Sequence, residues 1–293
     1  MIKQAVLSKD MNYQYLEFVK VNRNKRHKFR QFFVEGVRNI NAAIQYKWHI
    51  CSFIYAQNAK LSRWATETLD TVKTDVNYEL SAKLMADLSD KEDTSELVAI
   101  VAMQEFDFSQ FAFSANPVLA LFDRPSNRGN LGTILRSCDA LGVEGLIITG
   151  HAVDLYDPDV IVSSTGSFFK VPVVSMEGPA DVAAFVQQMK AEYPGFRTIG
   201  TTAHKQSNLY DIDMTQPLLF MIGNETDGLS RAFRDTSDVL ATIPMSADSS
   251  ASSLNVSCAA AVLFYEANRQ RSRQHAQATG PGHLPGDPGK TRL

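Results

Sequence analysis

The sequence predicts an α/β protein with a small N-terminal α/β domain and a larger C-terminal domain built on a parallel sheet. Short apolar runs typical of strands alternate with amphipathic stretches typical of helices along most of the chain. In the second half the strand candidates are apolar at nearly every residue, as in a parallel sheet covered on both faces. A polar stretch with four phenylalanines, residues 104–117, ends in Asn-Pro and separates the halves. The 293 residues suffice for about two domains.

The first 103 residues are expected to form the smaller domain. The strand candidates are residues 31–34, 49–56 and 97–103, and the helix candidates are residues 37–46 and 62–69. The four phenylalanines of the next stretch could form a stacking surface for bases. The preferred interpretation of residues 104–117 is a linker whose phenylalanines pack against both domains.

Residues 118–270 are expected to form a doubly wound domain, because strand, loop and helix follow one another several times. The strand candidates are residues 118–122, 146–149, 171–174, 198–202, 218–222 and 240–243, and the helix candidates are 131–141, 181–192 and 255–269. Residues 271–293 are rich in Gly, Pro and polar residues and have no period, which predicts a disordered tail.

Composition excludes several classes of protein. Hydrophobic residues make up 44% and charged residues 21%, as in ordinary soluble proteins. No apolar run approaches the roughly 20 residues of a membrane span, and the first residues lack the apolar core of a signal peptide. The three cysteines are far apart, and no histidine has ligand spacing with another His or Cys, so neither disulfides nor a metal site is predicted. We expect a cytoplasmic protein without membrane contact.

The net charge of −3 conceals a basic segment at residues 20–30, which holds six Lys or Arg side chains and no acid. By itself this segment is equally consistent with a solvated helix face and with a surface that binds RNA phosphates. Its five candidate RNA-binding residues are Arg23, Lys25, Arg26, Lys28 and Arg30.

Three irregular loops follow strand candidates of the second half, where open parallel sheets bind their ligands. They are residues 127–137, 223–230 and 243–257. Each could be an ordinary turn or helix cap. The first lacks the GxGxxG dinucleotide motif, and the chain has no GxxxxGK[ST] phosphate loop and no GxSxG nucleophile motif. Arg136, on the first turns of a predicted helix, could bind a phosphate or carboxylate with two hydrogen bonds.

Together these loops resemble the three ordered motifs of the SpoU/TrmH family of AdoMet-dependent RNA ribose 2′-O-methyltransferases, of the SPOUT class. The matching segments are residues 130–136 (NLGTILR), 223–230 (GNETDGLS), 243–245 (IPM) and 253–257 (SLNVS). Residues 32–37 (FFVEGV) resemble the L30e-like substrate-binding domain of the family. One departure is Thr226-Asp227, where the family often has a small residue; we expect the loop to tolerate it.

The resemblance implies a C-terminal SPOUT domain with a deep trefoil knot, a homodimer formed through that domain, and S-adenosyl-L-methionine as cofactor. Gly223, Ile243 and Leu254 would line the AdoMet pocket, with Met245 and Thr202 as weaker candidates. The residues at catalytic or substrate-positioning positions are Asn130, Arg136, Glu225, Ser253 and Asn255. Glu225 would either orient Arg136 or a neighbouring amide, or act as a structural carboxylate that accepts backbone N–H groups.

The implied reaction is transfer of the AdoMet methyl group to a ribose 2′-hydroxyl. A guanidinium is a poor base, so Arg136 is expected to hold the adjacent phosphate and to stabilise the developing alkoxide. The separate N-terminal domain favours large-subunit ribosomal RNA over tRNA. The alternatives are a non-catalytic RNA-binding protein that keeps the fold and, less favoured, a SPOUT enzyme that methylates a base nitrogen.

Overall fold

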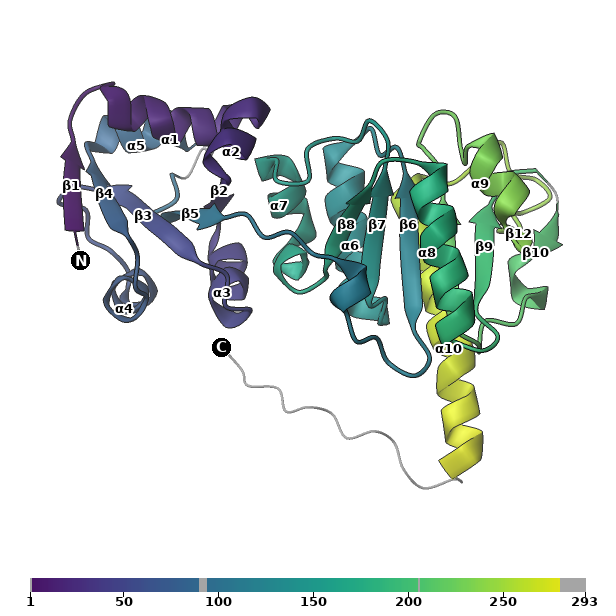
Figure 1. The fold of residues 1–293 in the computed structure, drawn as a ribbon. Coiled ribbons are helices and arrows are strands. Elements are labelled where there is room, and N and C mark those ends of the chain that lie inside the picture. Colours follow the sequence, from purple (N-terminus) through teal and green to yellow (C-terminus); the bar gives the residue numbers. More distant parts are fainter. Residues whose placement is uncertain (1, 90–93, 205, 280–293) are drawn as a thin grey trace.

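The structure is a computed structural model that describes residues 2–89, 94–204 and 206–279. It contains two sheets, each with its own helices, which lie side by side and are joined by the segment after residue 102 (Figure 1). Within the described residues no helix is both long and apolar enough to cross a bilayer.

The N-terminal domain is built on a five-stranded mixed sheet. Its strand order is β1 (Ile2–Val6), β4 (Val76–Leu80), β3 (Ile50–Ala56), β5 (Val98–Ala102) and β2 (Gln31–Glu35). The first three are parallel, and β5 is antiparallel to both β3 and β2. The helices are α1 (Met11–Val21), α2 (Arg23–Phe29), α3 (Val37–Gln45), α4 (Arg63–Thr71) and α5 (Ala82–Leu88).

The three strands and two helices predicted in this domain are confirmed, and β1, β4, α1, α2 and α5 are additional. Edge strand β1 escaped prediction because four of its five residues are exposed and its sequence, IKQAV, lacks the apolar run expected of a buried strand. Helices α1 and α5 contribute Leu16, Val19, Leu84 and Met85 to the core on one face of the sheet.

The C-terminal domain has a seven-stranded, entirely parallel sheet. Its strand order is β10 (Ser207–Asn208), β12 (Val239–Thr242), β9 (Arg197–Thr201), β11 (Leu218–Ile222), β6 (Val118–Asp123), β7 (Gly145–Thr149) and β8 (Val173–Met176). The helices are α6 (Arg128–Leu141), α7 (Pro158–Ser164), α8 (Pro179–Glu192), α9 (Arg231–Thr236) and α10 (Val256–Thr279). The six predicted strands and three predicted helices are all present.

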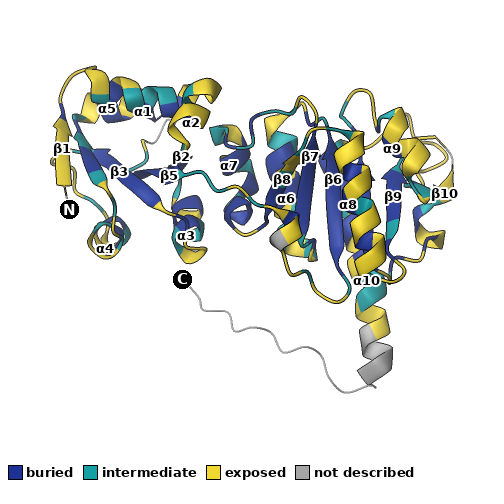
Figure 2. Ribbon diagram, viewed as in Figure 1, coloured by how far each residue is buried: buried dark blue, intermediate teal, exposed yellow. Residues whose placement is uncertain are grey.

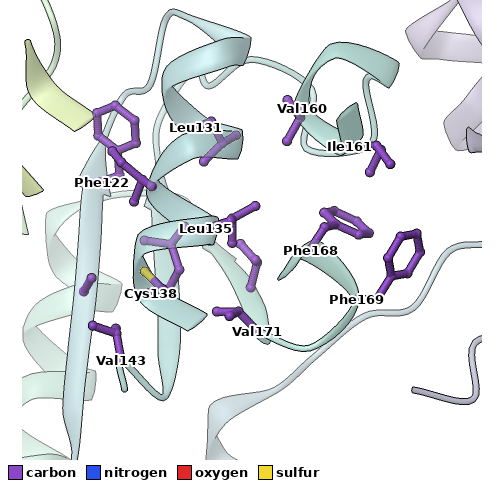
Figure 3. Packing of buried hydrophobic residues seen from close by; sticks show 14 of the residues in the cluster. Phe122, Leu131, Leu135, Cys138, Val143, Val160, Ile161, Phe168, Phe169 and Val171 are labelled. Carbon is purple, nitrogen blue, oxygen red and sulfur yellow. The ribbon is translucent and has the colours of Figure 1, made fainter. Parts of the chain in front are cut away.

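Helices cover both faces of this sheet, which confirms the doubly wound arrangement and explains the apolar strands. On one face α6, α7 and α10 pack with residues such as Leu131, Leu135 and Phe264, as Figure 3 shows for α6 and α7. On the other face α8 and α9 pack through Phe185 and Phe233. Figure 2 shows the strands of the sheet buried between these layers.

One continuous hydrophobic cluster joins the two domains. Phe32 and Trp48 of the N-terminal domain pack against Phe168 and Phe169, with ring centroids 5.5 Å apart for Phe32–Phe168 and 5.4 Å apart for Trp48–Phe169. Trp48 Nε1 donates a hydrogen bond to the carbonyl of Phe169 (2.9 Å). The two domains therefore share part of their core.

The segment between the sheets packs as the linker interpretation predicts. Phe106 packs edge-on against Trp48 of the N-terminal domain, with ring centroids 6.1 Å apart. Phe108 packs against Phe185 of α8, with centroids 5.9 Å apart. The phenylalanines of the linker thus contact both domains, and Phe108 is buried.

The predicted start of the disordered tail at residue 271 is wrong, because α10 continues to Thr279. The Arg271 guanidinium donates hydrogen bonds to the carbonyls of Met214 (2.9 Å) and Asn116 (2.6 Å) in the loops preceding β11 and β6. These polar contacts hold the last turns of the helix against the domain. The sequence there has no apolar period, so the prediction did not include these turns in the helix. The rest of the predicted tail, residues 280–293, lies outside the described residues.

Candidate functional site

A pocket of about 720 Å³ lies at the carboxyl ends of β9, β11 and β12. It is bounded by the ends of these strands, by the loop after β11 and by the segment before α10. All five residues predicted to bind the cofactor line it: Thr202, Gly223, Ile243, Met245 and Leu254. The structure therefore brings together residues from three separate loops, as expected of a ligand site at the edge of a parallel sheet.

Gly223 allows the chain to fold tightly at the end of β11. A Cβ atom there would lie 2.0 Å from the backbone nitrogen of Leu229, so no other residue fits without displacing the loop. Asn224 and Gly228 exchange two backbone hydrogen bonds of 3.0 Å, and Gly228 has a positive φ of 68°. The resulting loop forms one wall of the pocket.

The Thr226-Asp227 pair fits this loop, which confirms the tolerance expected for it. Both residues are exposed. Their backbone N–H groups donate to the side-chain oxygen of Asn224, at 2.8 Å from Thr226 and 3.2 Å from Asp227. This side-chain-capped turn does not require a small residue at either position.

Glu225 connects the loop after β11 to the start of α6. Its carboxylate accepts hydrogen bonds from the backbone N–H groups of Ser126 and Asn127, both at 3.0 Å, and from the Ser126 hydroxyl at 2.7 Å. Of the two roles considered for Glu225, these contacts match the structural carboxylate.

The same carboxylate links all three motifs through Asn130. The Asn130 amide donates to Glu225 (3.3 Å), and Asn130 Oδ1 accepts a hydrogen bond from the Asn255 amide (3.2 Å). Asn255 Oδ1 in turn accepts from the backbone N–H (2.9 Å) and hydroxyl (2.6 Å) of Ser257, in the first turn of α10. Three predicted site residues, one from each motif, therefore form one hydrogen-bonded chain beside the pocket.

The hydrogen bonds keep Glu225 ionised. Partial burial, the largest single influence, would raise its pKa, but the hydrogen bonds from Ser126 and Asn130 together outweigh it. The pKa of Glu225 therefore lies below its ordinary value. A carboxylate of lowered pKa with its oxygens occupied is suited to positioning the loops and poorly suited to accepting a proton.

The remaining two predicted catalytic residues are placed differently. Ser253 lines the pocket and is exposed. Arg136 is also exposed, but it lies about 9 Å further along α6 than Asn130 and does not line the pocket. Its side chain forms no hydrogen bond or ion pair with any residue in the described part of the chain.

Asp123, which was not among the predicted site residues, stabilises the loop that carries Glu225. It is buried at the end of β6 and accepts hydrogen bonds from the Ser230 backbone N–H (2.9 Å) and the Thr149 hydroxyl (3.0 Å). It thereby ties β6 to β7 and to the loop that carries Glu225. An acid directly after a fully apolar strand was the available signal. Additional residues of the pocket wall that the analysis missed are His204, Tyr210 and Arg234.

The structure corrects the assignment of Arg26 as an RNA-binding residue. Arg26 is 2% exposed, and its guanidinium pairs with Asp154 (2.8 Å) and Asp157 (3.3 Å) of the C-terminal domain. A buried guanidinium that already has two carboxylate partners is not available to an RNA phosphate. Lys25 is half-buried, and Arg23, Lys28 and Arg30 are exposed.

One group of metal-ligand side chains comes together away from the pocket, in the described part of the N-terminal domain. His49, Cys51 and Asp75 offer ligand atoms that all lie within 4.8 Å of one another. His49 and Asp75 already form an exposed ion pair at 3.1 Å. None of the three residues lines the pocket.

Sequence comparisons divide the chain in the same way as the two sheets. Residues 117–265 match the SpoU rRNA Methylase family, and residues 10–99 match the SpoU L30e-like domain. The chain is 40% identical to the 23S rRNA (uridine(2479)-2′-O)-methyltransferase of Streptomyces viridochromogenes over 269 residues, covering 92% of this chain and 93% of that protein. It is 25% identical to the 23S rRNA (guanosine(2553)-2′-O)-methyltransferase RlmP of Bacillus subtilis, covering 83% and 90% respectively.

The fold is similar to that of solved methyltransferases. The SpoU methyltransferase AviRb from Streptomyces viridochromogenes, in complex with AdoMet, superposes with a TM-score of 0.84 at 41% identity, covering 90% of this chain and 98% of that one. An RNA 2′-O ribose methyltransferase structure superposes with a TM-score of 0.75 at 28% identity, covering 92% and 100%.

Proposed function

The chain belongs to the SpoU rRNA methylase family, and on that premise we propose that it transfers a methyl group from AdoMet to a ribose 2′-hydroxyl of 23S rRNA. The observation that carries this proposal is the hydrogen-bonded chain of Glu225, Asn130 and Asn255, which unites the three motifs beside one pocket. Ribosomal RNA is preferred over tRNA as substrate because the named relatives that cover most of the chain act on 23S rRNA.

The pocket fits AdoMet in size and chemistry. Its volume of about 720 Å³ lies within the range of about 300–1,000 Å³ that is typical of small-molecule sites. Ile243, Met245 and Leu254 offer apolar surface to the adenine base, and the ends of β9, β11 and β12 offer backbone groups. Bound there, AdoMet supplies a methyl group on a sulfonium centre.

In the reaction the 2′-oxygen would form its bond to the methyl carbon as the carbon–sulfur bond of AdoMet breaks, S-adenosylhomocysteine would leave, and the hydroxyl proton would pass to solvent water. The chain's own residues must align the ribose hydroxyl and stabilise the charge that develops on it. We assign Arg136 to holding the neighbouring phosphate and stabilising the negative charge that develops on the 2′-oxygen, because a guanidinium stays protonated and does not act as a base. Asn130, Glu225 and Asn255 position the loops. We assign Ser253, which lines the pocket and is exposed, to contacting the substrate.

The exposed cations of the basic segment are assigned to RNA phosphates. Arg23, Lys28 and Arg30 are exposed, and Lys25 is half-buried with its ammonium 5.3 Å from the ring centre of Phe18. Loss of each phosphate contact reduces the salt dependence of RNA binding, by about 0.7 in the log–log slope for single strands. These four residues replace the original five, since Arg26 is buried.

Dimerisation and a knot belong to the same proposal. We propose a homodimer formed through the knotted domain, because α10 exposes large apolar side chains, with Val262 38% and Tyr265 59% exposed. Support for the knot comes from β11, which inserts between β6 and β9 although both precede it, followed by α10 packing on α6. We also propose that the enzyme acts in the cytoplasm, which agrees with a 23S rRNA substrate.

The test is incubation of the protein with labelled AdoMet and, separately, total ribosomal RNA and total tRNA, followed by nucleoside analysis. We expect a labelled 2′-O-methylnucleoside from ribosomal RNA. Label only in tRNA would overturn the substrate, and label on a base would overturn the reaction. Failure to bind AdoMet by calorimetry would favour the alternative of a non-catalytic RNA-binding protein.

A further inference from the structure

A second hollow, of about 460 Å³, lies between the two domains. One wall comes from α2 and the linker of the N-terminal half, and the other from the carboxyl ends of β7 and β8 with the loop that follows β7. We call this hollow the interdomain cleft. The strands that bound it belong to the same sheet as the methyl-transfer pocket and end at the same edge, with β6 between the two sites.

The buried Arg26 holds α2 in place along this cleft. Its pairs with Asp154 and Asp157 cross from one domain to the other, and its Nη1 also donates to the carbonyl of Val19. Residues three positions apart on a helix share a face, so Arg23 lies on the same side of α2 as Arg26. Arg30 is the left-handed C-cap residue of α2, directly after its last residue. Both of these arginines line the cleft, together with His27.

The cations at the cleft have only weak partners inside the protein. Arg23 Nη1 donates to the carbonyl of Ala152 (3.2 Å). Arg30 pairs with Glu105 at 2.6 Å, with 55% of the arginine side chain and 77% of the glutamate side chain exposed. Exposed pairs of this kind contribute about 1 kcal/mol or less, so a phosphate can displace the glutamate.

The floor of the cleft is apolar and of a size suited to a base. It includes Phe106, Ile148, Val173 and Tyr156, and the last of these is held by a hydrogen bond from its hydroxyl to the carbonyl of Gln104. Unpaired bases of RNA are typically bound by aromatic and apolar surfaces while arginines bind their phosphates. Glu105 and Asp154 also line the cleft, but Asp154 is paired with the buried Arg26 and the Glu105 pair is exposed. Two arginines beside an apolar floor therefore match a nucleotide.

We propose that the interdomain cleft binds an unpaired nucleotide of the substrate RNA, with its base on the apolar floor and its phosphates on Arg23 and Arg30. This inference rests on the proposed function. Neighbouring strands lie about 4.8 Å apart, so β7 is about 10 Å from β11 across β6. An RNA strand that follows the carboxyl edge of the sheet can reach both the cleft and the methyl-transfer pocket.

The first experiment removes the rim charges. We compare the double variant Arg23→Ala/Arg30→Ala with Arg63→Ala/Lys83→Ala, which removes the same charge from the exposed surfaces of α4 and α5. Binding of fluorescently labelled 23S rRNA transcript is measured against salt concentration, and AdoMet binding by calorimetry. We expect the first variant to weaken RNA binding about tenfold or more and to lower the salt slope, with AdoMet binding unchanged in both. Equal effects of the two variants would overturn the proposal.

The second experiment fills the cleft without changing its charge. Ser175 lines the cleft from β8 and is exposed, so Ser175→Trp blocks the cleft without disturbing the core. Thr66→Trp on exposed α4 is the matched control. We expect only Ser175→Trp to weaken RNA binding, by about tenfold. Unchanged RNA affinity would show that the arginines act as open-surface phosphate contacts and would overturn the proposal.

A third experiment tests whether the cleft binds a nucleotide of RNA or a free nucleotide. Mononucleotides such as UMP and GMP are titrated against the wild-type protein and Ser175→Trp. Tight mononucleotide binding that Ser175→Trp abolishes, combined with unchanged RNA affinity, would assign the cleft to a free nucleotide and overturn the proposal. If the wild-type protein binds the transcript through the cleft but methylates no RNA, the proposed function fails while the cleft as an RNA site stands.

Discussion

The two domains are both layered α/β structures, but they use their sheets differently. In the C-terminal domain all seven strands are parallel, and the loops at their carboxyl ends gather the predicted site residues around one pocket. In the N-terminal domain one of the five strands, β5, runs opposite to the others, and the functional candidates lie on helix α2 and at its C-cap. When all strands are parallel, the loops that follow them all lie at one edge of the sheet, whereas in a mixed sheet these loops are divided between the two edges.

This difference agrees with the proposed roles of the two domains: methyl transfer in the domain with the parallel sheet, and RNA binding by the domain with the mixed sheet. The buried Arg26 and the Trp48 contacts make the two parts one unit. Each variant should therefore change mainly one of four measured properties: AdoMet binding, turnover, RNA binding or stability. The following predictions use that separation, from the largest expected effect to the smallest.

The largest effect is expected in turnover from Arg136→Ala. Removal of a group that stabilises a developing negative charge typically lowers the rate by about a hundredfold to a thousandfold. AdoMet affinity should remain unchanged, because Arg136 does not line the pocket. The measurement is single-turnover methylation with AdoMet calorimetry, and Arg231→Ala, on the exposed surface of α9, is the control. Wild-type turnover in Arg136→Ala would remove Arg136 from the mechanism.

Arg26→Ala should weaken the connection between the two domains and lower the free energy of unfolding by about 3 kcal/mol. The substitution leaves the nearly buried carboxylate of Asp154 without its arginine partner. Arg128→Ala is the matched control, because Arg128 also pairs with Asp157 (3.1 Å) but is 54% exposed; we expect it to cost about 1 kcal/mol or less. Urea denaturation measures both. Equal losses would contradict a special role for the buried pair.

Gly223→Ala should weaken the binding of AdoMet. The added Cβ would overlap the backbone at Leu229, and relief of such overpacking costs about 1–3 kcal/mol, equivalent to a loss of about fivefold to 150-fold in AdoMet affinity if the loop shifts. Gly178→Ala is the control, since its Cβ would meet nothing within 4 Å. Calorimetry with AdoMet measures the difference. Unaltered affinity in Gly223→Ala would show that the pocket tolerates a displaced loop.

The smallest effect concerns the charge of Glu225. Because its pKa is lowered in the folded protein, its hydrogen bonds stabilise the loops fully above the ordinary carboxyl pKa, and that stabilisation is lost as the pH falls through the lowered value. AdoMet affinity should therefore be constant above about pH 5 and decrease below it. Glu225→Gln should lose about 1 kcal/mol at neutral pH and show a flatter pH profile over the same acidic range. Parallel profiles for the two proteins would contradict this role.

The sequence predicted the parallel sheet from local apolar patterns, whereas the pocket-lining residues came from the resemblance of its three motifs to the SpoU/TrmH family. Apolar runs identify buried strands, and the residues that follow them must lie at the carboxyl edge of a parallel sheet. The motif positions Gly223, Ile243 and Leu254 follow strands in this way, and all three line the pocket. In contrast, β1 was missed because an exposed edge strand has no apolar pattern.

The burial of Arg26 and the exposure of most of its basic neighbours at positions 23–30 could not be predicted from the order of these residues in the sequence. Arg26 resembles its neighbours in the chain, yet it is buried because Asp154 and Asp157, about 130 residues later, lie opposite it. The same holds for α10, whose extension past residue 270 depends on carbonyls that Arg271 meets in distant loops. Charge and polarity are local properties, whereas the partner that neutralises a charge is supplied by the tertiary structure.

The sequence by itself therefore determined the fold class, the family and the motif residues that line the pocket, since periodicity and motif order can be read along the chain. Only the tertiary structure decided that Glu225 binds backbone amides at the start of α6, that Arg26 joins the domains, and that Arg23 and Arg30 face an apolar cleft. Each of these depends on contacts between segments about 100 residues or more apart, and local preference carries no information about such contacts.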